Sequence, residues 1–242
     1  MQQIKQDNLP KHIVVIPDGN RRWAREKGLN SWRGHYEGVK ALEKILDATD
    51  NLDIFCFSFW GASVDNILER SKREAAVLKE LFIIHFARLL KQRRIFEKEI
   101  RVNVFGEWQK YFPAKVKEPM GELINATKEY NNFFLNFFIM YDGRIEMVET
   151  IKKIVALSGR DKNLEITPEL IKSNLYTFGL PPVDLVIRTG VEGDPHNSAG
   201  FMMWDTACSQ LYFTKTLWPD FGEKEFLKAI ESYQKRERRM GA

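Results

Sequence analysis

Short apolar runs alternate along this chain with longer segments in which apolar residues recur every three or four positions. The runs are rich in β-branched and aromatic residues, and they predict strands at 13–16, 53–60, 100–106, 133–141 and 183–187. The spaced segments predict helices at 20–27, after 34–35, and at 71–99, 113–130, 147–155, 167–175 and 223–239. This alternation predicts an α/β fold, a single domain over residues 1–242 with a mainly parallel central sheet of about six strands flanked by helices.

The segment 71–99 is predicted to form one long helix with a broad apolar face. Ser71 and Glu74 have the spacing of a capping box at its start. The apolar face suits either the hydrophobic core or an apolar tunnel for an acyl chain. Within this face, His85 is expected to be a hydrogen-bonded interior residue.

Composition narrows the class of protein. The chain has 242 residues, of which 44% are hydrophobic and 12% aromatic, enough for one substantial core. The net charge of +4 comes from basic residues scattered among 33 acids, which argues against nucleic-acid binding and leaves small anionic ligands. Cys56 and Cys208 are expected to be reduced, buried thiols. No apolar run is long enough to span a bilayer, so we expect a soluble cytoplasmic protein that could touch a membrane surface peripherally.

Charged residues follow the first predicted strand directly. The strand 13–16 ends at Pro17, and the turn Asp18-Gly19-Asn20 leads into a helix that carries Arg21 and Arg22. A helix N-terminus with adjacent guanidinium groups attracts phosphate, and a carboxylate beside phosphate is a ligand for Mg²⁺. The stretch therefore indicates a diphosphate site, although a solvent-exposed turn capped by an aspartate would use the same residues.

The residues His12 to Ala24 resemble the first signature of the cis-prenyltransferases, the undecaprenyl diphosphate synthase family, written H-x-x-x-I-M-D-G-N-x-R-W-A. Only the methionine differs, because Pro17 replaces it. The resemblance extends along nearly the whole chain. It implies that Asp18 holds Mg²⁺ and orients the diphosphate of an allylic substrate, and that residues 19–23 (Gly19, Asn20, Arg21, Arg22 and Trp23) bind that leaving group.

A second family pattern, R-x-x-G-H-x-x-G, matches at Gly34, His35 and Gly38. In the family, its histidine and arginine help to hold the allylic diphosphate. Here Ser31 occupies the arginine position and Arg33 follows two places later, so the guanidinium is either shifted or missing. A histidine at the start of a helix would otherwise be a capped surface residue.

The end of the second predicted strand carries the next group of polar residues. Ser63, Asp65, Asn66 and Arg70 resemble the family's S-x-E/D-N-x-x-x-R-S signature. The resemblance implies substrate binding at these positions, with Asn66 and Ser63 assisting removal of a proton. The same residues could simply cap the helix that follows.

The strand 183–187 also ends in charge, and Arg188 belongs to the family's D-L-x-I-R-T motif. The resemblance implies that Arg188, together with Ser198, grips the diphosphate of isopentenyl diphosphate. The stretch 191–198 departs from the family because it contains two or three inserted residues and lacks a second arginine. Only His196 offers a positive donor there.

Two further residues are candidates for the metal site that the resemblance implies. Glu192 lies in the altered stretch, and Gln210 replaces a glutamate that the family uses for magnesium. The amide oxygen of a glutamine can still coordinate Mg²⁺, but the side chain brings no charge.

The resemblance implies an enzyme that condenses an allylic diphosphate with isopentenyl diphosphate to form a (Z)-polyprenyl diphosphate. Two alternatives stay open: irregular, head-to-middle coupling of two allylic diphosphates, because residues 191–198 lie on the acceptor side, and a non-catalytic subunit of a heteromeric prenyltransferase. We expect a homodimer, because the segment 217–221 looks too apolar to remain exposed. Small residues at Gly61 and Ala62 predict a product of medium to long length.

Overall fold

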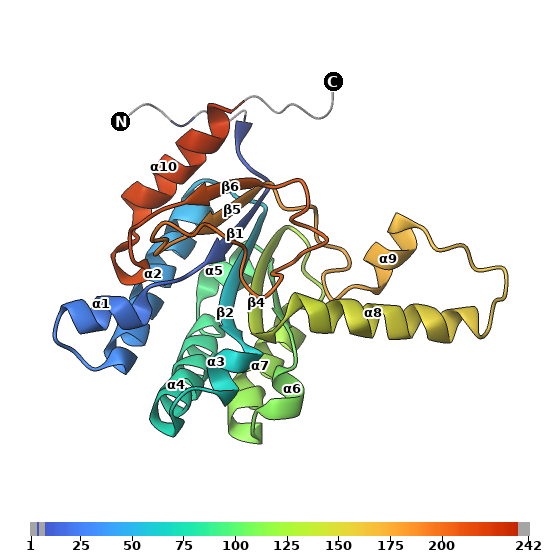
Figure 1. Cartoon of the computed structure of the whole chain (residues 1–242), viewed down its shortest axis with the longest axis horizontal. Helices are drawn as coiled ribbons and strands as arrows, with labels where there is room; N and C mark the ends of the chain where they lie inside the picture. Colours follow the sequence, from blue (N-terminus) through green and yellow to red (C-terminus); the bar gives the residue numbers. More distant parts are fainter. Residues whose placement is uncertain (1–3, 5–7, 237–242) are drawn as a thin grey trace.

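The computed structural model describes residue 4 and residues 8–236, and within them the predicted α/β architecture is confirmed (Figure 1). A six-stranded sheet has the order β3-β4-β2-β1-β5-β6, and every neighbouring pair is parallel. The strands are β1 (His12–Ile16), β2 (Cys56–Ser63), β3 (Ile100–Phe105), β4 (Phe133–Tyr141), β5 (Leu185–Arg188) and β6 (Gln210–Phe213).

Helices connect the strands and cover the sheet. In chain order they are α1 (Asn20–Glu26), α2 (Ser31–Asn51), α3 (Val64–Leu68), α4 (Lys72–Leu89), α5 (Arg93–Glu97), α6 (Trp108–Tyr111), α7 (Ala114–Thr127), α8 (Gly143–Ser158), α9 (Pro168–Asn174), the short 3₁₀ helix η2 (Trp218–Asp220) and α10 (Glu223–Gln234). In the part of the chain that the structure describes, no helix has the length and apolar character needed to cross a membrane.

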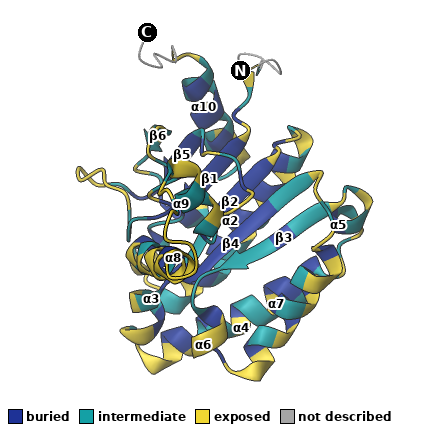
Figure 2. Cartoon of the chain, turned by 90° about the vertical axis from the view of Figure 1, so that its right-hand side faces the viewer, coloured by how far each residue is buried: buried dark blue, intermediate teal, exposed yellow. Residues whose placement is uncertain are grey.

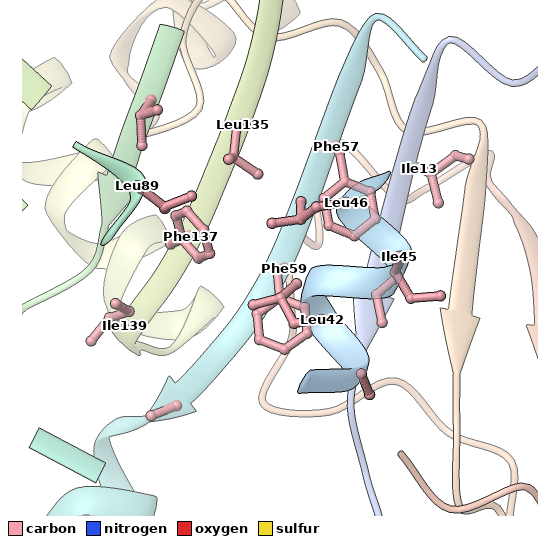
Figure 3. Packing of buried hydrophobic residues seen from close by; sticks show 14 of the residues in the cluster. Ile13, Leu42, Ile45, Leu46, Phe57, Phe59, Leu89, Leu135, Phe137 and Ile139 are labelled. Carbon is pink, nitrogen blue, oxygen red and sulfur yellow. The ribbon is translucent and has the colours of Figure 1, made fainter. Parts of the chain in front are cut away.

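The central strand β1 feeds two hydrophobic cores because successive side chains of a strand point to opposite faces of the sheet. Ile13 and Val15 belong to the larger core, where the sheet packs against α2, α4 and α7 (Figure 3). Val14 and Ile16 belong to a smaller core on the other face. This burial on both faces explains the uninterrupted apolar run of β1.

Some predicted boundaries were wrong. The helix predicted over 71–99 is two helices, because the extended backbone at Gln92 separates α4 from α5 and turns the chain toward β3. The helix predicted after 34–35 begins earlier, at Ser31, because Asn30 already has the extended backbone of a cap. The last helix, predicted to reach residue 239, ends at Gln234, and residues 237–239 lie outside the described part of the chain.

Other differences concern the start of strand β2 and the burial of one cysteine. Strand β2 starts at Cys56 instead of residue 53, because the chain is still leaving α2 there and Asp53 has a positive φ. It continues through Gly61 with an irregular register against β4. Of the two cysteines predicted to be buried, Cys56 is buried and Cys208 is exposed.

Candidate active site

The candidate site lies at the carboxyl edge of the sheet, where parallel sheets bind ligands. Asp18 follows β1, Asn66 lies one turn beyond β2, and Arg188 ends β5. These three residues, predicted from separate segments of the sequence, line one cavity of about 260 Å³. His35, Arg70 and Ser198 line the same cavity.

The backbone of Asp18 is held firmly while its side chain stays accessible. The Thr189 hydroxyl donates to the Asp18 carbonyl at 2.8 Å and accepts from the Asp18 amide at 2.9 Å, and the Trp218 amide donates to the same carbonyl at 3.0 Å. The carboxylate, 44% exposed, lies 3.4 Å from an Arg22 nitrogen and 3.2 Å from an Arg188 nitrogen. Asp18 is therefore a fixed carboxylate between two guanidinium groups, at the mouth of the cavity.

Arg22 connects the first turn to the stretch after β5. Its guanidinium lies 2.8 Å from Glu192 Oε1 and donates to the Gly190 carbonyl at 2.5 Å. Gly190 has φ +65°, and a Cβ there would lie 2.6 Å from an Arg22 nitrogen and 2.7 Å from the Asp18 carbonyl oxygen. A residue with a side chain at position 190 would thus push Arg22 out of this arrangement.

A buried network stands behind the mouth of the cavity. His35 Nε2 donates to Glu74 Oε1 at 3.0 Å, and an Arg70 nitrogen lies 3.2 Å from the same carboxylate oxygen. Arg21, which is largely exposed, lies 3.7 Å from it. Hydrogen bonding from His35 and the charge of Arg70 lower the pKa of Glu74, whereas burial lowers the pKa of His35. Glu74 therefore holds a histidine and two arginines beside the polar mouth.

Close packing of α2 against α1 fixes the position of Asn20. A Cβ at Gly34 would lie 1.9 Å from the Asn20 carbonyl oxygen, and one at Gly38 would lie 2.4 Å from Asn20 Oδ1. The Trp218 indole donates to the Gly38 carbonyl at 2.8 Å on the other side. Asn20 Oδ1 is buried and has no hydrogen-bond partner within the described residues. A side chain at position 34 or 38 would therefore collide with Asn20, and this accounts for the glycine at both positions.

The polar residues after β2 divide into a structural and an accessible group. The buried Ser63 hydroxyl accepts from the Asn66 amide at 3.0 Å and caps α3. Asn66 lines both the cavity and a neighbouring polar hollow, in which Asp65 and Arg70 also lie. Ser63 therefore caps the short helix α3 and not the long helix that the sequence suggested, while Asn66 lines the cavity.

One side of the cavity mouth is built from the end of β5 and the stretch after it. The Arg188 side chain, only 8% exposed, donates to the His196 carbonyl at 2.8 Å. The imidazole of His196 is half exposed and lies against Asp194, so its ring faces the Asp194 side chain, not Arg188. Ser198 lines the cavity. The sequence predicted that the His196 ring would serve the site, but in the structure the backbone carbonyl of His196 contacts Arg188 instead.

Beyond the polar mouth the cavity becomes apolar, with α2, β2, α4 and β4 as its walls. Part of the apolar face of α4 thus lines this cavity, and the rest packs into the larger core. His85 also lines the cavity, and both its ring nitrogens are buried without a hydrogen-bond partner in the described chain. The predicted hydrogen bonding of His85 was wrong; instead, its ring packs edge-to-face against Phe86 and Phe137.

A second hollow of about 50 Å³ continues the line of the cavity. On each of four elements, one residue lines the cavity and a neighbouring residue further along lines this hollow. The successive residues are Leu42 and Leu46 on α2, Phe59 and Phe57 on β2, Phe86 and Leu89 on α4, and Phe137 and Leu135 on β4. The two spaces are therefore lined by successive residues of the same four elements.

Some predicted site residues lie elsewhere. The Trp23 indole donates to Asp220 at 2.8 Å and is covered by Lys27, so it supports α1 instead of the cavity wall. Gln210 begins β6 opposite Leu185, at the other end of β5 from Arg188, so the structure separates it from Asp18 within this chain. Glu192 reaches Arg22.

Across residue 4 and residues 8–236, no group of three or more His, Cys, Asp or Glu residues could hold a metal ion.

Sequence reasoning missed two residues of the site. Glu74 looked like the second half of a capping box, and its backbone amide does bond the Ser71 hydroxyl, while its side chain turns to His35. Arg25 lines the polar mouth together with residues 18–22. The spacing of Arg25 from Arg21 and Arg22 on one helix was the available signal for it.

Known proteins resemble this chain along its whole length. A family model described as putative undecaprenyl diphosphate synthase matches residues 16–241. A tritrans,polycis-undecaprenyl-diphosphate synthase (geranylgeranyl-diphosphate specific) from Pyrococcus furiosus is 40% identical over 243 residues, covering 100% of this chain and 90% of that protein. An isoprenyl transferase from Thermus thermophilus is 35% identical over 247 residues, covering 100% of this chain and 92% of that protein.

Solved structures agree with this assignment. The crystal structure of lavandulyl diphosphate synthase from Lavandula x intermedia in complex with dimethylallyl diphosphate has a TM-score of 0.87 at 27% identity, covering 97% of this chain and 99% of that one. A probable undecaprenyl diphosphate synthase from Campylobacter jejuni has a TM-score of 0.75 at 26% identity, covering 97% of this chain and 100% of that one. The chain therefore belongs to the undecaprenyl diphosphate synthase family, and it is a prenyltransferase.

Proposed function

We propose that this prenyltransferase condenses an allylic diphosphate with isopentenyl diphosphate and releases a (Z)-polyprenyl diphosphate. One observation carries the proposal: a single cavity begins at Asp18, His35 and Arg188 and ends between apolar walls. A diphosphate fits the charged mouth, and a growing hydrocarbon fits the interior. Relatives named as specific for geranylgeranyl diphosphate support that compound as the allylic substrate.

On the donor side, the residues would neutralise the departing diphosphate. Arg22 and Arg70 supply fixed charge, His35 supplies a polar ring edge, and the N-terminal amides of α1 point toward the turn. Charge that is held in place before the reaction stabilises the developing negative charge without reorganisation. The buried Glu74 keeps His35 and Arg70 oriented for this role.

Mg²⁺ fits Asp18 because this ion is often bound by one carboxylate and the phosphates of the substrate, keeping several waters. Asp18 is a fixed, accessible carboxylate at the mouth of the cavity, so it would hold the ion without further protein ligands. When bound, Mg²⁺ would supply Lewis-acid stabilisation of the leaving group.

On the acceptor side, Arg188 and Ser198 would hold isopentenyl diphosphate. Asn66 faces the same cavity and would assist removal of the proton after the new carbon–carbon bond has formed, with an oxygen of the released diphosphate accepting that proton. The carboxamide needs no charge for this, because it can orient the accepting oxygen by hydrogen bonding.

The tunnel supports a product of medium to long length. Each isoprene unit adds five carbons, whose burial stabilises the bound chain by about 4 kcal/mol, so elongation continues while space remains. The distance along α4 from Glu74 to His85 is about 16 Å at the rise of an α-helix, and the second hollow lies beyond. Displacement of the Phe86 and Phe137 rings would join the two spaces.

The decisive experiment incubates the purified chain and Mg²⁺ with radiolabelled isopentenyl diphosphate, with and without geranylgeranyl diphosphate, and in a separate reaction with radiolabelled dimethylallyl diphosphate alone. The dephosphorylated products are identified by chromatography. Polyprenyl products that need both substrates support the proposal. A product from dimethylallyl diphosphate alone would instead support irregular coupling, which the altered stretch 191–198 and the lavandulyl diphosphate synthase neighbour favour as the second candidate. No product from any pair would support a non-catalytic subunit.

We also propose a homodimer, but the segment 217–221, from which the sequence predicted it, does not form the contact surface. Leu217, Trp218 and Phe221 are buried within the chain. The apolar surface lies instead on α8, which projects from the sheet and exposes 50% of Val148, 55% of Ile151 and 63% of Val155 (Figures 1 and 2). Sedimentation at micromolar concentration should give a dimer mass, and Ile151→Glu should give a monomer.

A further inference from the structure

The stretch that carries Ser198 and the His196 carbonyl forms turns without sheet or helix pairing, and something must hold it against the cavity. We call residues 196–202 the acceptor segment. The Gly143 amide donates to the Ala199 carbonyl of this segment at 2.9 Å, and two further contacts hold its far end. Phe201 is fully buried and stacks on Trp60 with ring centroids 5.8 Å apart, and the Met202 amide donates to the Tyr141 hydroxyl at 3.2 Å.

Tyr141 is itself held by a second hydrogen bond. Its hydroxyl donates to Glu146 Oε2 at 2.5 Å, and the other carboxylate oxygen of Glu146 accepts from the Tyr176 amide at 2.8 Å. Glu146 is only 3% exposed. In the described part of the chain no basic side chain forms an ion pair with it, and burial raises its pKa.

A buried carboxylate without a cation is costly, and a neutral residue could pack in the same space. What a carboxylate does better is fix the direction of the Tyr141 hydroxyl. An ionised carboxylate only accepts, so the Tyr141 proton must point at Glu146 and a lone pair stays available for the Met202 amide. The side-chain amide of a glutamine at position 146 could donate to the Tyr141 hydroxyl, and the hydroxyl proton would then point away from residue 146.

We propose that Glu146 is a positioning residue for the second substrate: through Tyr141 and the Met202 amide it sets where the acceptor segment presents Ser198 and supports Arg188. The inference rests on the proposed function, because it assigns isopentenyl diphosphate to that segment. The chain of contacts runs over two hydrogen bonds from Glu146 to Met202 and meets the donor side further on, where an Arg188 nitrogen lies 3.2 Å from Asp18. It therefore predicts a larger effect on isopentenyl diphosphate than on the allylic diphosphate.

The test compares Glu146→Gln, Tyr141→Phe and the double variant with wild type. Glu149→Gln is the matched control, because Glu149 lies on the same helix, is only partly buried and forms an ion pair with Lys152. We expect KM for isopentenyl diphosphate to rise about tenfold in each single variant and no further in the double variant, because both act on one contact. KM for the allylic diphosphate should stay within twofold. Hydrogen exchange in peptides covering 199–204 should accelerate in the same three variants.

Several results would overturn the proposal. Equal increases in both KM values would indicate a general structural effect, and additive effects in the double variant would separate Glu146 from Tyr141. If Glu146→Gln does not fold, Tyr141→Phe still decides, because it keeps the ring packing against Phe138 and Phe201. An unchanged KM for isopentenyl diphosphate in that variant refutes the proposal. If wild type does not use isopentenyl diphosphate at all, the proposed function fails, while exchange at 199–204 still reports whether Glu146 holds the segment.

Discussion

Acidification should destabilise the folded chain through His85, and the size of the effect can be worked from its surroundings. The imidazole is 6% exposed, and its ring packs against Phe86 and Phe137. Neither ring nitrogen has a hydrogen-bond partner in the described residues. Burial, with a smaller contribution from the charge of Arg88, lowers the pKa of His85 from 6.5 to about 4.

The sign follows from proton binding. Between pH 6.5 and about 4 the unfolded chain binds a proton at His85 that the folded chain does not, so the free energy of unfolding falls as the pH falls through this window. The stabilisation is complete above pH 6.5 and is lost near pH 4. The difference between the two pKa values corresponds to roughly 3 kcal/mol, a large share of the stability of a typical domain.

Urea unfolding of wild type and His85→Leu, at one protein concentration and at pH 7.5, 5.5 and 4.5, tests this reasoning. At pH 7.5 the variant should be more stable by about 1–2 kcal/mol, because it removes a buried polar group that has no partner. On acidification it should lose about 3 kcal/mol less than wild type. His12, whose pKa burial also lowers to about 4, titrates in both proteins and serves as an internal reference. Equal losses in the two proteins would show that His85 is not neutral and buried.

Four other changes test separate parts of the structure. Asp18→Ala should lower kcat more than tenfold without shifting the unfolding midpoint, because its carboxylate is accessible, and retention of a tenth of the activity would contradict its metal role. Glu74→Gln should raise KM for the allylic diphosphate and spare KM for isopentenyl diphosphate in steady-state kinetics. Gly38→Ala should cost about 1–3 kcal/mol in urea unfolding, because its Cβ would lie 2.4 Å from Asn20 Oδ1. Phe137→Ala should lengthen the product seen by chromatography, and an unchanged product would show that this ring does not limit the tunnel.

The sequence predicted the fold well because its signals were local. Buried parallel strands read as apolar runs, and turn chemistry followed them directly, so the strand ends that carry Asp18, Asn66 and Arg188 could be placed at one edge of the sheet. The boundaries that failed depended on backbone conformations of single residues, such as the extended Asn30 before α2 and the positive φ of Asp53 before β2.

Side-chain partners across elements were beyond sequence reasoning. Glu74 satisfied a local rule at the start of α4, and nothing in the sequence shows that its carboxylate turns 39 residues back to His35. His85 looked like an interior residue with a partner, because most buried polar groups have one. The segment around Trp218 looked too apolar to stay exposed and was assigned to a dimer contact, because its partners within the chain, α2 and the first turn, are remote in the sequence.

The two halves of the site are built in different ways. On the donor side, helix packing fixes the groups, because Gly34 and Gly38 bring α2 into contact with Asn20. On the acceptor side, turns carry the groups, and the Met202 amide and the Phe201 ring anchor these turns to the smaller core. Insertions in turns are tolerated far better than insertions between packed helices. The altered stretch 191–198 can therefore vary without disturbing the helix packing that holds Asn20, and the ion pair between Glu192 and Arg22 links it to the first turn.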